Sequence, residues 1–252
     1  MAQDSRLSRR QLLAGSVAAG SAALAGGAPL AEAHVIHGEV PWQEGEANVP
    51  VPAAPGDAYQ FFTADEAAFV EAFVARIIPK DDLGPGALEA GAAIFIDRQL
   101  AGAFGAAERW YMQGPWEKGS DSQGYQSRYT PAALYRAAIK DIDEYCRKTH
   151  GGNVFARLTP AQQDEVIGGL EKGTVKLDHA EAKTFFTVAQ QNTVEGFFSD
   201  PIYGGNRDMV GWKLIGFPGA RYDYRPWVGQ HNKPFPLPPV GLHGRPGWTP
   251  KS

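Results

Sequence analysis

The apolar residues of this chain recur mainly at helical spacing. Phe69, Phe73 and Ile77 lie four positions apart, which places their side chains on one face of a helix. Thr63 and Glu66 precede this run as a capping box, the arrangement that satisfies free N–H groups at the start of a helix. A proline two residues after Ile77 ends the segment. The pattern therefore predicts a first helix that begins directly after Thr63.

Four further segments show the same period with comparable boundaries. They run over about 87–100, from Thr130 to Gly151, from Thr159 to Gly173, and from Asp178 to Phe197. Asp178 and Glu181 are expected to cap the last of these helices, whose phenylalanines predict a central buried position. Alternating strand patterns are nearly absent, so we expect an all-α fold with about five helices. The helices should form a single irregular domain over residues 58–216.

Two aromatic-rich stretches do not fit a self-contained helical domain. Residues 102–129 contain Gly and Ser together with Trp110 and Trp116, although loops longer than about 15 residues are uncommon in compact domains. Residues 217–252 hold eight prolines interleaved with aromatic residues. Such an extended Pro-rich tail can lie along another protein with its rings as anchors, so both stretches are expected to contact a partner. The alternative is a tail that wraps on its own domain.

The N-terminus has the three regions of a twin-arginine (Tat) signal peptide over residues 1–33. Arg9 and Arg10 form the basic pair, an Ala- and Gly-rich stretch follows, and Ala31-Glu32-Ala33 offers a small-x-small cleavage site. We expect export to the periplasm in a folded state, and an extended arm over residues 34–57 after cleavage. The net charge of −4, without a basic run, argues against binding to nucleic acid or to anionic membranes.

The chain lacks the familiar motifs of catalytic, nucleotide and metal sites. It contains no glycine-rich dinucleotide or phosphate loop, and its six histidines lack metal-site spacing. Cys146 is the single cysteine, which excludes an internal disulfide. We interpret Cys146 as a small core residue, with a bridge to another chain left open, and Glu89 and Asp97 as members of a polar helix face. No catalytic, cofactor-binding or metal-binding residue is therefore expected.

Two alternative metal sites remain, each with specific residues as candidate ligands. His34, with a free α-amino group after cleavage, and His37 could hold copper, although solvated histidines near a flexible terminus are commoner. Asp200, Asn206 and Asp208 lie close enough in sequence to supply calcium ligands. Their proline and glycine neighbours instead favour a role in turn formation.

Several longer phrases resemble one protein family. The first group consists of Arg76-Ile77-Ile78-Pro79, Gly84-Pro85-Gly86-Ala87, Glu89-Ala90-Gly91 and Phe95-Ile96-Asp97. The second consists of Glu195-Gly196-Phe197-Phe198, Asp200-Pro201, Tyr203-Gly204-Gly205-Asn206, Gly211-Trp212-Lys213 and Gly216-Phe217-Pro218-Gly219. Between them stand Arg109-Trp110-Tyr111 and Gly114-Pro115-Trp116. Together they resemble the gluconate 2-dehydrogenase subunit 3 family over nearly all of the expected mature chain.

The resemblance implies the small subunit of a heteromeric complex at the outer face of the inner membrane. Its implied partners are a large FAD-dependent catalytic subunit of the glucose–methanol–choline class and a multihaem cytochrome c subunit. FAD and haem c are therefore expected in the partners and no cofactor in this chain. The small subunit would carry the Tat signal for the flavin subunit and support its folding. Gluconate is the substrate that the family name implies, but fructose, glucose and sorbitol dehydrogenases use related subunits.

We expect the subunit contact at the turn after the last helix, together with the aromatic loop and the tail. The residues proposed for this contact are Trp110, Trp116, Tyr203, Gly204, Gly205, Asn206, Trp212 and Trp227. Two functions of another class remain as alternatives, an independent periplasmic metalloenzyme and a freestanding binding module.

Overall fold

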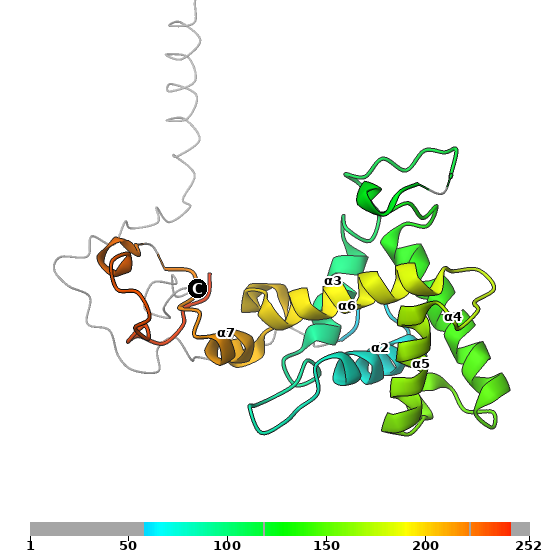
Figure 1. Cartoon of the computed structure of the whole chain (residues 1–252), viewed down its shortest axis with the longest axis horizontal. Coiled ribbons are helices and arrows are strands. Elements are labelled where there is room, and N and C mark those ends of the chain that lie inside the picture. The colour runs from blue at the N-terminus through cyan, green and yellow to red at the C-terminus, as the bar shows by residue number, and fades with distance from the viewer. Residues whose placement is uncertain (1–57, 118, 222, 243–252) are drawn as a thin grey trace, which may run out of the picture. The chain divides into compact units, whose positions relative to one another are not determined.

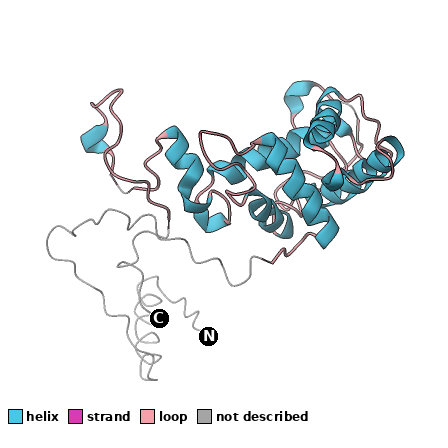
Figure 2. Ribbon diagram, turned by 90° about the horizontal axis from the view of Figure 1, so that it is seen from below, coloured by secondary structure: helices cyan, strands magenta, loops and turns pink. Residues whose placement is uncertain are grey.

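The described part of the chain consists of α-helices joined by turns, loops and short 3-10 helices. The computed structural model describes residues 58–117, 119–221 and 223–242, in which no β-strand occurs (Figures 1 and 2). The all-α prediction is confirmed. The elements are α2 (Ala64–Ile77), α3 (Ala92–Ala101), η2 (Asp121–Gln123), α4 (Pro131–Thr149), η3 (Phe155–Arg157), α5 (Pro160–Lys172), α6 (Ala182–Phe198), η4 (Pro201–Tyr203), η5 (Arg207–Met209), α7 (Val210–Ile215) and η6 (Arg225–Trp227). None of these helices has the length and hydropathy of a membrane span.

Three helices begin at the capping residues that the sequence predicts. At α2, the Thr63 hydroxyl accepts the N–H of Glu66 at 3.4 Å, and the Glu66 carboxylate accepts the N–H of Thr63 at 2.9 Å. Thr159 and Gln162 form the same reciprocal pair ahead of α5, and Thr130 caps α4. These bonds satisfy N–H groups that a helix leaves unpaired in its first turn, which is why local sequence was enough to place the three boundaries.

The start of α3 differs from the prediction, because the helix begins at Ala92 and not at about Ala87. Gly91 has a φ of 79°, in the left-handed region, and separates the preceding turns from the helix. A Cβ at Gly91 would lie 2.7 Å from Nε of Arg207 and 2.9 Å from the carbonyl oxygen of Gly204. Contacts with a segment distant in sequence therefore set the start of α3, and the helical period of the sequence does not predict it.

The centre of the helical body is α6, as its apolar sequence predicts. We use the name helical body for residues 58–101 and 130–198, in which α6 contacts α2, α3, α4 and α5. The ring of Phe185 packs against those of Phe69 and Tyr135, with centroids 6.2 and 5.4 Å away. The predicted cap is wrong in detail, because Glu181 at the N-cap makes no side-chain cap bond and Asp178 lies outside the first turn.

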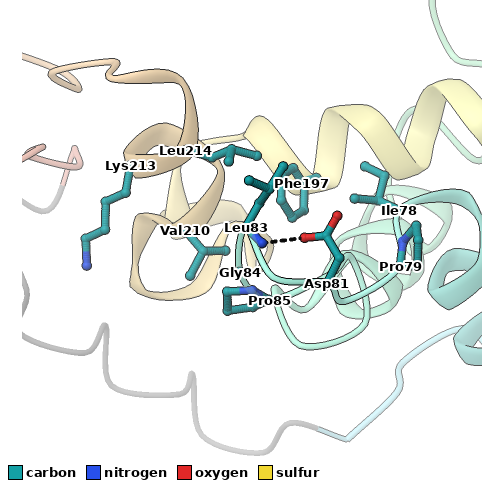
Figure 3. A pocket seen from close by; sticks show the side chains of 10 residues that line it. All are labelled: Ile78, Pro79, Asp81, Leu83, Gly84, Pro85, Phe197, Val210, Lys213 and Leu214. Atoms are coloured by element: carbon teal, nitrogen blue, oxygen red, sulfur yellow. Dashed lines mark hydrogen bonds between the residues drawn. The ribbon is translucent and has the colours of Figure 1, made fainter.

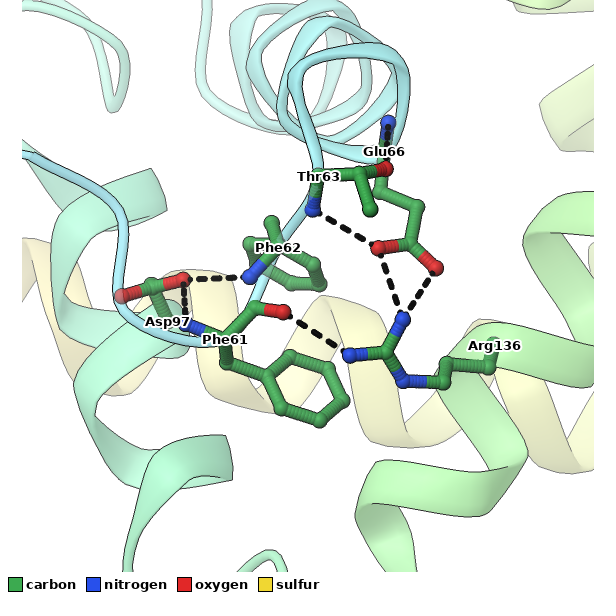
Figure 4. Close-up of polar contacts among 6 residues, drawn as sticks. All are labelled: Phe61, Phe62, Thr63, Glu66, Asp97 and Arg136. Atoms are coloured by element: carbon green, nitrogen blue, oxygen red, sulfur yellow. Dashed lines mark hydrogen bonds and ion pairs between the residues drawn. The ribbon is translucent and has the colours of Figure 1, made fainter.

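The segment that leads into α2 is fixed by Asp97 on α3 (Figure 4). The buried Asp97 carboxylate accepts the N–H of Gln60 at 2.6 Å, and those of Phe61 and Phe62 at 2.9 Å each. The interpretation of Asp97 as part of a polar helix face is therefore wrong, since it is an internal acceptor. Arg136 on α4 adds a second tie, because it donates to the Phe61 carbonyl at 2.9 Å and covers the Phe61 ring at 4.3 Å.

A second buried carboxylate fixes the connection between α5 and α6. Asp141 on α4 accepts the N–H of His179 at 2.7 Å and that of Ala180 at 3.1 Å, and the imidazole of His179 lies 2.8 Å from its other oxygen. Burial by itself would raise the pKa of Asp141, but the hydrogen bonds from the His179 side chain and from the two backbone groups outweigh it and lower the pKa. Two irregular segments of the body are thus each held by a carboxylate from a helix distant in sequence.

Candidate subunit-contact surface

The turn after α6, which we call the corner (residues 199–209), presents two apolar side chains to solvent. Asp200 stabilises it, because one carboxylate oxygen accepts the N–H of Ile202 at 3.0 Å and the other accepts that of Leu242 at 2.7 Å. Both oxygens therefore bind backbone groups, which agrees with the interpretation of Asp200 as a turn former. Ile202 and Tyr203 are left 40% and 49% exposed.

The inside of the corner is occupied by Asn206 and Trp212, both proposed as contact residues. Asn206 is fully buried, and its amide donates to the Ser199 carbonyl at 2.8 Å while its oxygen accepts the N–H of Gly211 at 2.9 Å. The Trp212 ring is 5% exposed and donates to the Phe198 carbonyl at 2.7 Å. Both side chains hold α7 against α6 and are covered by their own chain. In this structure they lie beneath the surface of the corner, and their role in a subunit contact stays a prediction.

The backbone of the corner is unusual, because four of its residues adopt left-handed conformations. Gly204 has a φ of 95°, and Asn206, Asp208 and Met209 have φ values of 45°, 55° and 54°. Residues other than glycine are sterically disfavoured in this region, and Asn and Asp are disfavoured least. Gly205 is buried, and a Cβ at this position would collide with the backbone of α6. The two glycines thus belong to the internal geometry of the corner.

The aromatic loop (residues 102–129) is held in part by its own rings. Trp110 contacts Phe104 and Tyr125, with ring centroids 5.7 and 4.9 Å apart. It remains 36% exposed, while Trp116 and Tyr111 are 43% and 80% exposed. Figure 1 shows the loop extending away from the helices between α3 and α4. The two tryptophans proposed for the subunit contact are therefore accessible to a partner.

The described part of the C-terminal tail folds back on itself. The N–H of Ala220 donates to the Val240 carbonyl at 2.6 Å, and the N–H of Val240 donates to the Pro218 carbonyl at 3.3 Å. Within the closed loop, Phe235 packs on Trp227 with centroids 4.9 Å apart. These contacts join two parts of the tail to each other, and the partner contact expected for the tail stays a prediction. Trp227, the proposed contact residue of the tail, is half-buried in this arrangement.

A shallow apolar hollow of about 290 Å³, which we call the α7 groove, lies between α7 and the turn of residues 78–85 (Figure 3). Its rims carry Leu83, 77% exposed, and Leu214, 49% exposed. Ile215 and Phe217, which follow Leu214 in the sequence but do not line the groove, are 60% and 44% exposed. Sequence reasoning missed this surface. Its signal was a short apolar stretch between Gly211 and Gly216, too short for helical periodicity to show two faces.

Two titratable groups outside this surface, Cys146 and Glu89, have local structural roles. Cys146 is fully buried, and burial, followed by the nearby Asp143 carboxylate, raises the pKa of its thiol to about 12. Its interpretation as a core residue is confirmed, and the buried sulfur argues against the bridge to another chain that the sequence left open. Glu89 accepts the N–H of Gly86 at 3.1 Å. The described residues contain no group of three or more potential metal ligands.

Some predictions fall on residues whose structure is not described. The Tat signal with Arg9 and Arg10, the arm, and the pair His34 and His37 all lie outside the described residues. They remain predictions from the sequence.

Comparison with protein families gives one match. A family model described as gluconate 2-dehydrogenase subunit 3 matches residues 64–219, from the start of α2 to the beginning of the tail. The chain belongs to the gluconate 2-dehydrogenase subunit 3 family. Searches against curated proteins and against solved structures returned no match. The resemblance noted in the sequence is thus confirmed at the level of the family.

Membership of the gluconate 2-dehydrogenase subunit 3 family makes this chain a small subunit of an oxidoreductase complex, with dehydrogenase partners. The matched region includes the helical body from the start of α2 onward, the aromatic loop, the corner and the α7 groove. It ends at Gly219, so nearly all of the tail lies outside it. Among the described residues, most of the exposed large apolar side chains therefore lie within the part that matches the family model.

Proposed function

We propose that this chain is a non-catalytic small subunit of a periplasmic gluconate 2-dehydrogenase-like complex at the outer face of the inner membrane. Its partners are a large FAD-dependent subunit of the glucose–methanol–choline class and a multihaem cytochrome c subunit. FAD and haem c belong to these partners, and this chain supports the folding and stability of the flavin subunit. The observation that carries the proposal is the family match over residues 64–219.

The Tat signal gives the subunit a second role, which is export of its partner. Tat transports folded proteins, so a signal on this chain can carry a flavin subunit that has already bound FAD in the cytoplasm. Arg9 and Arg10 are the residues that the export machinery reads in this proposal. One signal then serves the assembled pair, and stable assembly before export becomes part of the function.

The polar groups of the corner support a scaffolding role. Asp200 and Asn206 direct their side-chain oxygens at backbone N–H groups, where they fix local structure. The corner thereby holds Tyr203 at the surface. In the proposed contact, Tyr203 meets the partner together with three tryptophan rings of the aromatic loop and the tail. Those rings are Trp110, Trp116 and Trp227, while Gly204, Gly205, Asn206 and Trp212 act from beneath.

The experiment that tests the proposal replaces the basic pair in the full-length chain, as Arg9→Lys with Arg10→Lys, in its native host. We expect both this chain and the flavin subunit to remain in the cytoplasm, because the pair shares one signal. Dye-linked gluconate oxidation and bound flavin should then disappear from the periplasmic fraction. The matched control is Arg6→Lys, which lies outside the pair and should leave export unchanged.

Two results would count against the proposal. Export of the flavin subunit despite loss of this chain from the periplasm would refute the carrier role. Flavin, haem or metal bound to the chain purified alone, with turnover, would favour an independent enzyme. The substrate is assigned from the family name, and a panel of gluconate, fructose, glucose and sorbitol on the purified complex decides among the related dehydrogenases.

A further inference from the structure

A second hollow, which we call the α3–α6 hollow, lies where α3, the end of α6 and the corner meet. It has a volume of about 420 Å³. Its lining includes Phe95 on α3, Glu195 and Phe198 on α6, and Asp200 and Tyr203 in the corner. Three of these five side chains are aromatic and two are carboxylates. The hollow therefore combines apolar rings with negative charge.

The negative charge of the hollow has no basic partner among the described residues. Glu195 is exposed, and its carboxylate accepts the side-chain amide of Gln191 at 2.8 Å but forms no ion pair with a described Lys or Arg. Arg98 on α3 does not line the hollow and lies against the backbone of Gly204. A complementary occupant therefore carries a basic group next to an aromatic or apolar one.

The described part of the tail ends at this hollow. The N–H of Leu242 donates to the Asp200 carboxylate at 2.7 Å, and a Cβ at Gly241 would lie 3.4 Å from the same carboxylate. Leu242 is the last described residue, so the chain continues from a point next to the lining of the hollow. An extended chain covers about 3.3 Å per residue, so the ten residues from 243 to 252 are long enough to cross it.

Residues 243–252 have the composition that the hollow requires. They contain Arg245 and Lys251 but no Asp or Glu, and Trp248 lies between the two basic residues. Residues 43–57, which are also outside the described part, contain acidic residues but no Lys or Arg, so the carboxylates of the hollow would repel them. A second copy of the chain offers the same basic segment. Attachment next to the hollow, however, gives the segment of the same chain an effective concentration on the order of millimolar.

We infer that residues 243–252 occupy the α3–α6 hollow of their own chain. Arg245 pairs with Glu195 in this arrangement, and the Trp248 ring packs on Tyr203. Arg245 lies three residues beyond the hydrogen bond to the corner, which is about 10 Å of extended chain. An exposed ion pair and a pair of aromatic rings each contribute little alone, so the attachment of the segment next to the hollow is part of what holds it there.

Occupancy of the hollow has a consequence for assembly, because it covers Tyr203. Tyr203 is the residue of the corner that meets the partner in the proposed contact. The partner then has to displace residues 243–252 when the complex forms. This consequence rests on the proposed function, whereas occupancy of the hollow in the free chain does not.

The first test places benzoylphenylalanine, a photo-cross-linking amino acid that keeps an aromatic ring, at Tyr203 of the full-length chain. The chain is purified alone, mixed with an isotope-labelled copy and irradiated, and the adducts are identified by mass spectrometry. An adduct with residues 243–252 of the same chain supports the inference. An adduct with the other copy, an adduct elsewhere in the chain, or no adduct overturns it.

The second test reverses charges in the chain that carries this probe. Arg245→Glu and Glu195→Lys should each lower the yield of the adduct about threefold, which is the size of effect expected for an exposed ion pair. The two changes together should restore the yield. The matched control is Glu171→Lys, an exposed carboxylate of α5 that does not line the hollow, and it should change little. Circular dichroism checks that each variant is folded, and equal yields from all folded variants overturn the inference.

The same probe in the native host separates this inference from the proposed function. We expect the adduct with residues 243–252 in the free chain and an adduct with the flavin subunit in the assembled complex. If only the first forms, the inference stands and the proposed contact at Tyr203 fails. If only the second forms, the proposed contact stands and the inference fails.

Discussion

The helical body buries most of its large aromatic side chains, whereas the part of the chain after α6 leaves several large apolar side chains exposed. In the body, Phe69, Phe155 and Phe185 are at most 1% exposed, and the Phe69 ring packs on the other two. After α6, Ile215 and Phe217 are 60% and 44% exposed. The body therefore gains its stability from its own packing, whereas the C-terminal part displays apolar area whose burial requires another surface.

The backbone shows the same contrast. Two helices of the body, α2 and α5, begin at capping boxes, in conformations that any sequence with these residues favours locally. The corner instead contains left-handed Asp208 and Met209, which cost free energy relative to helical or extended backbone. Such conformations persist where the surrounding structure fixes them, as Asn206 does here through its buried hydrogen bonds. The corner thus keeps a defined backbone conformation that lowers the stability of the chain. Such a conformation is expected of a surface that contacts a partner.

The largest effect that would test this contrast is expected at Phe185. Phe185→Ala removes a fully buried ring that packs on Phe69, Phe73 and Tyr135, and should lower the free energy of unfolding by about 3–5 kcal/mol. The matched change Phe217→Ala removes a ring that is 44% exposed, and should cost less than about 1 kcal/mol. Urea unfolding of the purified chain, followed by circular dichroism, measures both.

The comparison of these two variants decides whether the regions differ as described. Equal destabilisation would show that the surface around Phe217 contributes to the stability of the isolated chain, and the division between the two regions would be wrong. A third variant, Phe198→Ala, gives an intermediate reference, since this residue is half-buried at the end of α6.

The parts of the fold that sequence predicted are those whose signals are local. The starts of α2, α4 and α5 follow from capping residues within three positions of each boundary, and the end of α5 follows from Gly173, which adopts a φ of 70°. The central position of α6 follows from its phenylalanines. Each of these features depends on residues next to one another in the sequence, so periodicity and turn chemistry are sufficient to find them.

The features that sequence missed depend on contacts between distant segments. Asp97 binds backbone groups 35 to 37 residues upstream, and nothing near it in the sequence distinguishes it from an exposed carboxylate. Asn206 and Trp212 appeared suitable for a partner contact, but their polar groups bind the chain itself. The α7 groove combines residues 78–85 with α7, and only folding brings these together.

The second largest effect is expected at Asp97, which tests whether a single carboxylate organises the start of the body. Asp97→Ala leaves the N–H groups of Gln60, Phe61 and Phe62 without their acceptor, and should lower the free energy of unfolding by about 2–4 kcal/mol. Asp97→Asn keeps one acceptor oxygen and should cost roughly half as much. Hydrogen exchange at residues 60–62 should accelerate in both. Unchanged exchange there would show that Arg136 and local packing hold the segment without Asp97.

The smallest effect is expected at Asp141, and it depends on pH. The folded-state pKa of Asp141 is lowered, so its contribution to stability is present above the unfolded-state value of about 3.9 and is lost as pH falls through the folded-state pKa. Asp141→Asn should cost about 1 kcal/mol at neutral pH, through its weaker bonds to the N–H groups of His179 and Ala180. The wild-type chain and the variant should therefore converge in stability below about pH 4. If the difference in unfolding free energy between wild type and variant stayed constant from neutral pH to pH 3, the ionisation of Asp141 would contribute nothing to stability. The fit of its side chain in the helical body would then account for its whole contribution.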